Sequence, residues 1–534
     1  MNYSTTLKIL PVLGLLLFSC QNKVKKDDNQ DAVKTVLNEE ELYRPNYHFT
    51  PENNWMNDPN GMFYLNGYYH LYFQHYPDGN TWGPMHWGHA TSLDLVNWKE
   101  QPIALYPDSL GYIFSGSAVV DYNNDSGFAK EGKPVVVAMY TYHDPVGEKE
   151  NTNTYQTQGI AYSQDEGLTW TKYEGNPVIK NTGIKDFRDP KITWDSFRDK
   201  WVMVLAAGQE TQFFESSNLK EWTFLSSFGE GIGNHNGVWE CPELIPFQVE
   251  DSEEVKWVLL VSINPGGPNG GSATQYFVGD FDGKKFSVDP AFKLAMQEDH
   301  NFWVDLGKDN YAGVTFSNTP ASDGRKIFMG WMSNWQYANK VPTEKWRSTM
   351  TIPRELTLEK VANTYRLYSN PVKEFEAHYG ETDLSWEKRT FKNGESLLDE
   401  NKIDLSKARI SFNLPDANKN FTFVLKNKVG DSLKFGYEAA KRSFFIDRKK
   451  SGIVDFNKSF ADIKSVAPRI STSGEIQVEL LLDKTSIELF YDKGETVMTE
   501  IFFPKEPYKD LIITGLDEGL LIENLTIDQL EFKQ

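Results

Sequence analysis

The sequence predicts an all-β protein, built as a β-propeller followed by a C-terminal β-sandwich. From about residue 46 onward, short runs rich in β-branched and aromatic residues alternate with Gly, Pro, Asn and Asp, and helical periods are few. A degenerate unit recurs four times in the first part of the chain, which is typical of propeller blades. In the last part, alternating strands separated by turns about every ten residues favour a sandwich.

The N-terminal residues are expected to be a leader rather than part of the fold. Residues 9–18 form an apolar stretch that is too short to span a bilayer. We interpret residues 1–20 as a signal peptide with a lipobox-like end, so that Cys20 would carry lipid after export across the inner membrane. The alternative is a conventional secreted protein cleaved nearby, because Phe18 departs from the small or aliphatic residue usual in a lipobox. The anchor would place the protein at the outer membrane, facing the periplasm or the cell surface.

Residues 21–43 follow as a polar segment with Lys-Lys and Asp-Asp runs, which predicts a flexible tether. The propeller is expected over residues 44–365. Its four recurring units each consist of a strand, an Asp or Asn turn and a closing aromatic residue. The closing residues are 72, 52 and 64 positions apart, which suits four-stranded blades with long loops. The units occupy residues 92–98, 163–170, 217–222 and 280–286.

The sequence changes character after the propeller. Residues 366–383 are expected to be a linker, with a short helix near Pro371. Residues 384–534 are expected to form the sandwich, because runs such as Ala408–Asn413 and Ile476–Leu482 resemble strands. No acidic and aromatic cluster like the first three occurs there in the sequence, so its expected role is structural packing against the propeller, with sugar binding as the lesser alternative.

Composition narrows the classes of function. The net charge of −20 argues against nucleic acid, whose phosphates would be repelled. It is compatible with a neutral substrate that needs no electrostatic steering. The chain has two cysteines, and if Cys20 carries lipid then Cys241 is the only other thiol, so no disulfide forms within the chain.

Three short acidic motifs are the strongest functional signal. Each places one carboxylate among Trp, Phe, Arg and Pro, where burial is expensive unless the group has a partner or a task. The motifs are Trp55–Gly61, Phe187–Pro190 and Trp239–Pro242. Their irregular composition suggests one acidic pocket built from distant loops, and inner strands of successive blades would bring them to one end of the channel. Glycoside hydrolysis needs such an arrangement, with one carboxylate as nucleophile and one carboxylic acid as proton donor.

These motifs closely resemble the signatures of glycoside hydrolase family 32, which includes invertases, inulinases and levanases. The resemblance extends to residues 114–117, 264–271 and 330–335, and covers roughly residues 44–530. It implies a five-bladed propeller before the sandwich, a retaining hydrolase, and no cofactor or metal.

The resemblance also implies roles for individual residues. Asp58 matches the nucleophile, Glu240 the acid/base and Asp189, next to Arg188, the transition-state stabiliser. Glu243 lies close to Glu240 in sequence but does not match the motif. The side chains expected to bind the sugar are Trp55, Asn57, Gln74, Trp82, Phe114, Ser115, Arg188 and Trp335.

Two other patterns in the sequence favour structural interpretations. Four histidines, at positions 70, 75, 86 and 89, fit no zinc spacing with a supporting Cys or carboxylate set, so core or hydrogen-bonded histidines are expected. The Gly-rich segment 266–271 lacks the Lys-Ser/Thr and helix of a phosphate-binding loop and is expected to be a wide hairpin loop near the channel mouth.

The resulting hypothesis is a secreted, lipid-anchored β-fructosidase. It would release terminal fructose from fructans such as levan or inulin, from fructo-oligosaccharides and from sucrose. One alternative is a fructosyltransferase, in which a sugar rather than water reaches the intermediate. A second is a non-catalytic fructan-binding surface lectin on the same fold. The intact acidic trio argues against the lectin, whose cheapest signature would be loss of a catalytic carboxylate.

Overall fold

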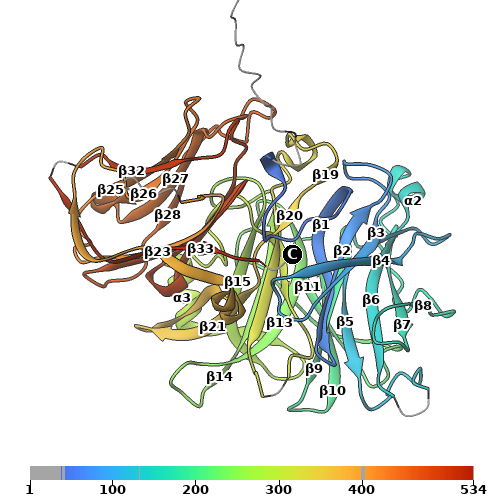
Figure 1. Ribbon diagram of the computed structural model, residues 1–534. Helices are drawn as coiled ribbons and strands as arrows, with labels where there is room; N and C mark the ends of the chain where they lie inside the picture. The colour runs from blue at the N-terminus through green and yellow to red at the C-terminus, as the bar shows by residue number, and fades with distance from the viewer. Residues whose placement is uncertain are drawn as a thin grey trace, which may run out of the picture. The chain divides into compact units, whose positions relative to one another are not determined.

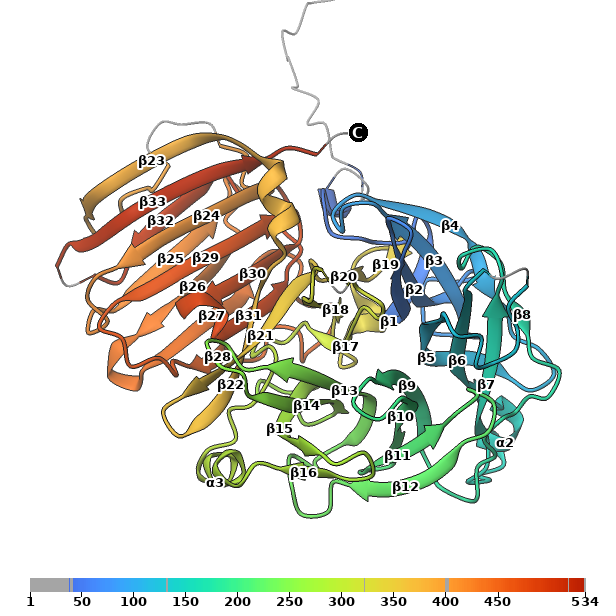
Figure 2. The same ribbon diagram turned by 90° about the horizontal axis from the view of Figure 1, so that it is seen from below.

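The computed structural model describes residue 38 and residues 42–130, 133–320, 322–398, 403–516 and 518–532. The predicted signal peptide, with Cys20, and nearly all of the predicted tether lie outside these residues. The described residues form seven β-sheets, of which five make a propeller and two make a sandwich (Figures 1 and 2). No described helix is long and apolar enough to cross a bilayer.

The five propeller sheets follow one another in chain order. Blade 1 contains β1 (Asn54–Leu65), β2 (Tyr68–Tyr76), β3 (His86–Ser92) and β4 (Trp98–Leu105). Blade 2 contains β5 (Tyr112–Asp121), β6 (Val135–His143), β7 (Gln156–Ser163) and β8 (Thr171–Lys172). Blade 3 contains β9 (Phe187–Asp195), β10 (Lys200–Ala207), β11 (Thr211–Ser216) and β12 (Thr223–Phe228). Blade 4 contains β13 (Val238–Gln248), β14 (Val255–Asn264), β15 (Ala273–Phe281) and β16 (Phe286–Val288). Blade 5 contains β17 (Tyr311–Thr315), β18 (Lys326–Met332), β20 (Thr349–Met350), β21 (Arg354–Val361) and β22 (Thr364–Pro371).

The ring of blades is closed at its innermost strands. β1, β5, β9, β13 and β17 surround a common centre, and each contacts the next, with β17 returning to β1 (Figure 2). The short strand β19 (Trp346–Arg347) leaves blade 5 and pairs in parallel with β1 of blade 1. This closure protects the sheet edges that an open propeller would expose. The predicted five-bladed propeller and sandwich are therefore confirmed.

The recurring units of the sequence are the turns between the third and fourth strands of blades 1 to 4. In each turn an Asp or Asn side chain accepts hydrogen bonds from backbone N–H groups two to four residues ahead, which fixes the turn. These residues are Asp94, Asp165, Asn218 and Asp282. In blade 5 the corresponding strands β21 and β22 are joined by only two residues, beginning with Ala362 at a φ of 53°. The fifth unit carries no Asp turn, so the sequence shows four repeats for five blades.

The sandwich consists of a six-stranded and a five-stranded sheet. The first has the order β23 (Tyr379–Phe391), β33 (Leu520–Leu530), β24 (Lys407–Leu414), β29 (Ile476–Asp483), β30 (Ser486–Tyr491) and β31 (Thr496–Ile501). The second has the order β28 (Ser465–Pro468), β27 (Ser443–Lys450), β26 (Ser432–Glu438), β25 (Phe421–Lys426) and β32 (Asp510–Thr514). The predicted domain limits at residues 365 and 384 fall inside β22 and β23.

The burial of the strands follows their sequences. Every residue of β6 is buried, because both faces of this strand pack against neighbouring blades. In β24, buried and partly exposed residues alternate, as expected for a sheet with one solvated face.

In the part of the chain that the structure describes, helices are few and short. The α-helices there are α2 (Pro145–Lys149) and α3 (Pro290–Glu298). The 3-10 helices are η1 (Ala338–Lys340), η2 (Lys373–His378), η3 (Ala439–Lys441) and η4 (Asp492–Gly494). η2 lies in the predicted linker, close to the helix expected after Pro371.

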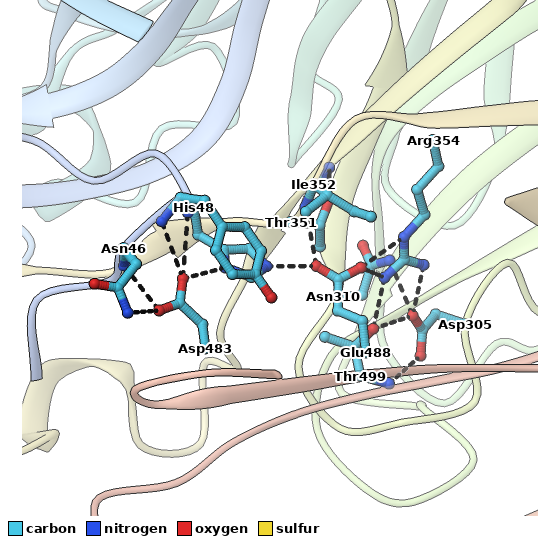
Figure 3. Close-up of polar contacts among 12 residues, drawn as sticks. Asn46, His48, Asp305, Asn310, Thr351, Ile352, Arg354, Asp483, Glu488 and Thr499 are labelled. Carbon is cyan, nitrogen blue, oxygen red and sulfur yellow. Dashed lines mark hydrogen bonds and ion pairs between the residues drawn. The ribbon is translucent and has the colours of Figure 1, made fainter. Parts of the chain in front are cut away.

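A buried network of charged side chains joins the propeller to the sandwich (Figure 3). Arg354 of β21 donates to Glu488 of β30 at 2.9 Å and to Asp305 at 2.9 Å. His48 bridges Glu488 and Asp483, with both contacts at 2.8 Å. Because each carboxylate has a cationic partner and these side chains are almost fully buried, the network defines how the two domains dock.

Candidate active site

The five innermost strands of the propeller share a distortion near their N-terminal ends. Each carries a β-bulge, where pairing with the second strand of its blade is interrupted. The interruptions lie between Met56 and Pro59 in β1, Ile113 and Gly116 in β5, Arg188 and Lys191 in β9, Glu240 and Glu243 in β13, and Tyr311 and Val314 in β17. A bulge turns side chains out of the regular alternation of a strand. The bulges therefore direct unpaired residues from all five blades towards the centre of the ring.

Backbone conformation within these bulges is unusual. Asp189, Cys241 and Ala312 have φ values of 65°, 43° and 53°, in a region that residues with a Cβ rarely adopt. Such conformations persist where the surrounding structure holds them, and they cluster at functional sites. The motifs were expected in loops, but they lie within the inner strands. Their irregular composition reflects the bulges rather than a loop.

Asp58 lies in the β1 bulge and is held by two neighbouring side chains. Ser115 Oγ donates to its Oδ2 at 2.7 Å, and Asn57 Nδ2 donates to its Oδ1 at 3.0 Å. Burial raises the pKa of Asp58, the two hydrogen bonds oppose this effect, and the charge of Glu240 adds to it. The carboxylate is thus fixed in orientation while remaining on the pocket surface.

Asp189 is more deeply enclosed, with 6% of its surface exposed. The backbone N–H of Cys241 donates to its Oδ2 at 3.0 Å, and the Cys241 Sγ lies 3.6 Å from the same oxygen and 3.7 Å from Asp58 Oδ2. Burial raises the pKa of Asp189 to about 7; Arg188 opposes this shift, and Glu240 and Asp58 add to it. The Cys241 thiol lies between the two aspartates, and burial together with their charges raises its pKa, so it stays protonated.

Glu240 is held at both carboxylate oxygens. Arg188 Nη2 donates to Oε1 at 2.9 Å, and the hydroxyl of Tyr311, on the innermost strand of blade 5, contacts Oε2. Arg188 also pairs with Asp186 at 2.7 Å and lies 3.8 Å from Asp189. One guanidinium therefore serves three carboxylates, two of which belong to the predicted trio.

The trio lines one pocket of about 350 Å³. This volume lies at the lower end of the range for small-molecule sites. The residues at its surface are Asn57, Asp58, Gln74, Trp82, Phe114, Ser115, Asp189, Glu240, Trp335 and Asn339. Trp82, at the rim, is 39% exposed and meets Phe114 edge to face. The pocket thus combines aromatic rings, amides and carboxylates, which are the groups that bind and cleave a sugar.

Two predicted sugar-binding residues lie behind this surface. Trp55 is fully buried, and its Nε1 donates to Asn57 Oδ1 at 2.7 Å while its ring stacks on Trp335. Arg188 acts on Glu240 rather than lining the pocket. Trp55 and Arg188 therefore each donate a hydrogen bond to a residue that faces the pocket, Asn57 and Glu240 respectively, and hold it in place.

Other candidate residues occupy separate sites. Glu243 accepts hydrogen bonds from the backbone N–H and the hydroxyl of Thr315 and pairs with Lys191 at 3.1 Å. It faces a second cavity of about 520 Å³, lined by residues further along the inner strands. That cavity contains none of the trio, so its larger volume does not make it the better catalytic candidate.

The four histidines are packed among aromatic rings and backbone carbonyls. His70 and His89 contact each other at 3.1 Å, and His75 Nδ1 lies 2.8 Å from the carbonyl of Trp55. Burial lowers the pKa of His70 and of His75 to about 4. Among the described residues, no group of three or more His, Cys, Asp and Glu side chains is arranged to hold a metal ion.

Tyr311 and Asn339 are site residues that the sequence did not predict, and neither did it predict the contact of Cys241 with the aspartates. Tyr311 stands outside the acidic motifs, and only closure of the ring brings it to Glu240. Asn339 lies shortly after residues 330–335, which resemble a family motif. Its closeness in sequence to Trp335 is the signal that could have identified it.

Comparison with known proteins agrees with this geometry. The family model for the glycosyl hydrolases family 32 N-terminal domain matches residues 48–371, and the model for the glycosyl hydrolases family 32 C terminal matches residues 376–528. A levanase of Bacillus subtilis is 45% identical over 496 residues, which cover 92% of this chain and 71% of the levanase. An extracellular exo-inulinase of Aspergillus ficuum is 38% identical over 510 residues, covering 91% of this chain and 94% of the relative.

Solved structures show the same likeness. The exo-inulinase of Aspergillus awamori superposes with a TM-score of 0.82 at 34% identity, covering 93% of this chain and all of the other. A fructofuranosidase variant of Schwanniomyces occidentalis, complexed with fructosylnystose, gives a TM-score of 0.78 at 36% identity and covers 93% of this chain and 99% of the other. The chain belongs to glycosyl hydrolase family 32 and is a glycoside hydrolase.

Proposed function

We propose that this protein is a retaining β-fructosidase that releases terminal fructose from fructans and from sucrose. Relatives named levanase and exo-inulinase support this class of substrate. The observation that carries the assignment is the convergence of Asp58, Asp189 and Glu240 on one pocket, with each carboxylate accepting a hydrogen bond from a neighbouring group.

In the proposed reaction Asp58 is the nucleophile. One of its carboxylate oxygens attacks the anomeric carbon C2 of a terminal fructosyl unit, and the bond from C2 to the leaving oxygen breaks. Glu240 gives its proton to that leaving oxygen. A water molecule then returns a proton to Glu240 and attacks C2, which frees Asp58 and releases fructose with its configuration retained.

Neighbouring groups prepare these carboxylates for their roles. Ser115 and Asn57 fix the orientation of Asp58, as an attacking group requires. Arg188 and Tyr311 fix both oxygens of Glu240. Asp189 would accept hydrogen bonds from ring hydroxyls that strengthen as the sugar acquires oxocarbenium character.

The shape of the pocket supports action at chain ends. A volume of about 350 Å³ and a rim formed by Trp82, Phe114 and Trp335 would enclose a single terminal unit and exclude the middle of a polymer. Fructose should then be the main early product.

A fructosyltransferase would share the same covalent intermediate and differ in its acceptor. Sugar at high concentration would then yield longer oligosaccharides in place of free fructose. A surface lectin would bind fructan without releasing any sugar.

The experiment is a product profile of the purified protein on levan, inulin and sucrose at low conversion, resolved by anion-exchange chromatography. Free fructose with little fall in polymer length is expected. A ladder of oligosaccharides appearing before fructose would contradict action at chain ends, and no product from any of the three would contradict the assignment as a whole.

We also propose that the enzyme is exported and held by lipid on Cys20. The names of its extracellular relatives support secretion, and the apolar stretch ending in Ser19-Cys20 supports lipid attachment. Metabolic labelling with a palmitate analogue should mark the wild type and spare Cys20→Ala; unlabelled wild type would contradict the anchor.

A further inference from the structure

One wall of the pocket is formed by a short segment, residues 334–340, that also contacts the sandwich. Trp335 and Asn339 of this wall segment line the pocket. Asn339 Oδ1 accepts a hydrogen bond from the backbone N–H of Trp82 at 2.9 Å. The wall segment therefore controls the position of three residues at the pocket surface.

The opposite side of the wall segment is bound by the sandwich. Tyr337 is 1% exposed and its ring packs edge to face on Phe460 at 5.1 Å. Its hydroxyl accepts a hydrogen bond from Arg448 Nη2 at 2.7 Å and donates to Asp309 Oδ1 at 2.6 Å. Asn457 Nδ2 of the sandwich donates to the carbonyl of Gln336 at 2.8 Å. Residues of the sandwich thus bind the wall segment immediately beside Trp335.

The propeller loop that supports the wall segment is itself tied to the sandwich. Ser272 Oγ accepts from the backbone N–H of Trp335 at 3.1 Å, and Asn334 Nδ2 donates to the carbonyl of Gly270 at 3.2 Å. Asn269, in the same loop, donates to the carbonyl of Val466 and accepts from its N–H, both at 2.9 Å. The second support of Trp335 therefore also ends on the sandwich.

The loop approaches the wall segment too closely for a side chain to fit between them. Gly271 has a φ of +74°, and a Cβ at this position would lie 2.1 Å from Asn334 Oδ1. This close approach transmits the position of the loop to the wall segment, because neither can move far without the other.

Arg448 fixes the geometry of the groups around it rather than adding net stability to the folded protein. It reaches from β27 to Asp309 at 2.5 Å and also donates to the carbonyls of Phe460 and Ile501 at 2.7 and 2.9 Å. A buried ion pair contributes little net stability because desolvation offsets it, but its directional hydrogen bonds specify one geometry.

We propose that the sandwich is a working part of the sugar pocket, with Arg448 and Asn457 as positioning residues that hold Trp335 and Asn339 through the wall segment. The inference rests on the proposed function and assigns the second domain a role in substrate affinity beyond structural packing.

The test compares Asn457→Ala, Tyr337→Phe and Arg448→Met with the control Arg409→Met. Arg409 pairs with Glu479 and Asp528, both within the sandwich, at 2.7 and 2.9 Å. Its loss disturbs the sandwich without removing a bond to the wall segment. Measurements are KM for sucrose, the inhibition constant of fructose, the melting temperature, and amide hydrogen exchange of residues 334–340.

The three test variants should raise KM and the fructose inhibition constant in parallel, by about five- to twentyfold, with a smaller change in kcat. Exchange of the wall segment should accelerate in them and stay unchanged in Arg409→Met. If Arg448→Met fails to fold, the two milder variants carry the test. Unchanged KM, inhibition constant and exchange in those variants would overturn the proposal, even if they melt at a lower temperature. If the wild-type protein releases no fructose, the proposed function is overturned instead. The exchange of residues 334–340 would then still show whether the sandwich holds the wall segment.

Discussion

The pocket and the propeller–sandwich interface both bury carboxylates, but they supply them with very different partners. At the interface, Glu488 contacts Arg354, His48 and the backbone N–H of Ile352. Burial alone would raise the pKa of Glu488, but Arg354 and His48 lower it below its usual value. Beside the pocket, Arg188 is shared by Asp186, Asp189 and Glu240, and the pKa of Asp189 rises to about 7.

This difference separates a structural cluster from a reactive one. A carboxylate whose charge is fully compensated is inert and fixes geometry, whereas one that is only partly compensated can exchange a proton or attack near neutral pH. Glu488 and the pocket carboxylates therefore show the same chemical group used in two ways, with more cations and N–H donors around the structural one.

The largest expected effect is on catalysis in the pocket. Asp58→Asn and Glu240→Gln should each lower kcat by about a thousandfold or more, because each removes a group that forms or protonates a bond. Turnover on sucrose is measured beside circular dichroism. Glu243→Gln, three residues along the same strand, is the control; it should lower the melting temperature but keep kcat within about tenfold. A folded Asp58→Asn variant with a near-normal rate would contradict the assignment.

The next effect concerns the single shared cation. Arg188→Met should lower kcat by about a hundredfold, because Glu240 loses its orienting partner and Asp189 loses its nearest positive charge. Arg198→Met is the matched control in the same blade, where Arg198 pairs with Asp195 at 2.9 Å. Equal losses of kcat in the two variants would show that the arginine is not specific to the pocket.

At the interface, the same kind of change should act on stability. Arg354→Met leaves Glu488 and Asp305 buried without their guanidinium, so the free energy of unfolding should fall by about 3–5 kcal/mol. kcat of the folded enzyme should fall far less than it does in Asp58→Asn, because Arg354 does not contact the pocket carboxylates. Denaturant titration measures the loss, and adding Glu488→Gln to Arg354→Met should recover part of it. If Arg354→Met lost all activity but kept the wild-type free energy of unfolding, the interface network would not be structural and the contrast with the pocket would be wrong.

The sequence predicted the pocket better than the interface, for physical reasons. Asp58, Asp189 and Glu240 stand in dense local motifs because each bulge needs special neighbours, such as Pro190 and Pro242. The interface network joins residues more than a hundred positions apart, such as Arg354 and Glu488. Arg354 stands in no distinctive motif. Glu488 lies within residues 484–495, which resemble the signature of the family's sandwich module, but that local pattern does not reveal its partner. Tyr311 was missed for the same reason.

The propeller shows the same limit. Four blades were visible because their turns repeat an Asp or Asn capping residue, while the two-residue turn at Ala362 carried no such mark. Trp55 was expected on the pocket surface because of its motif, but its full burial under Asn57 depends on packing that the sequence does not express.

The smallest expected effect is a pH dependence of stability at the interface. Burial alone would lower the pKa of His48, but its hydrogen bonds to Asp483 and Glu488 raise it from 6.5 to about 9. The folded state therefore binds this proton more tightly than the unfolded state does. The stabilisation is fully present below pH 6.5 and is lost as the pH rises to about 9.

Comparison of the wild type with His48→Gln should reveal this dependence. The difference in the free energy of unfolding should be larger at pH 6 than above pH 9 by about 3 kcal/mol. Urea titration at both pH values gives the measurement. A difference that stays constant across this range would show that His48 is neutral in the folded state.

The most direct test of the central claim is to trap the covalent intermediate. Glu240→Gln leaves the nucleophile intact and removes the acid/base that returns the enzyme to its free state. With an activated fructosyl donor whose leaving group needs no proton, this variant should accumulate one fructosyl unit on the peptide containing Asp58, detected by mass spectrometry after rapid acid quenching. Label on Asp189 or Glu243, or no label while the donor is consumed with inverted configuration, would contradict the account.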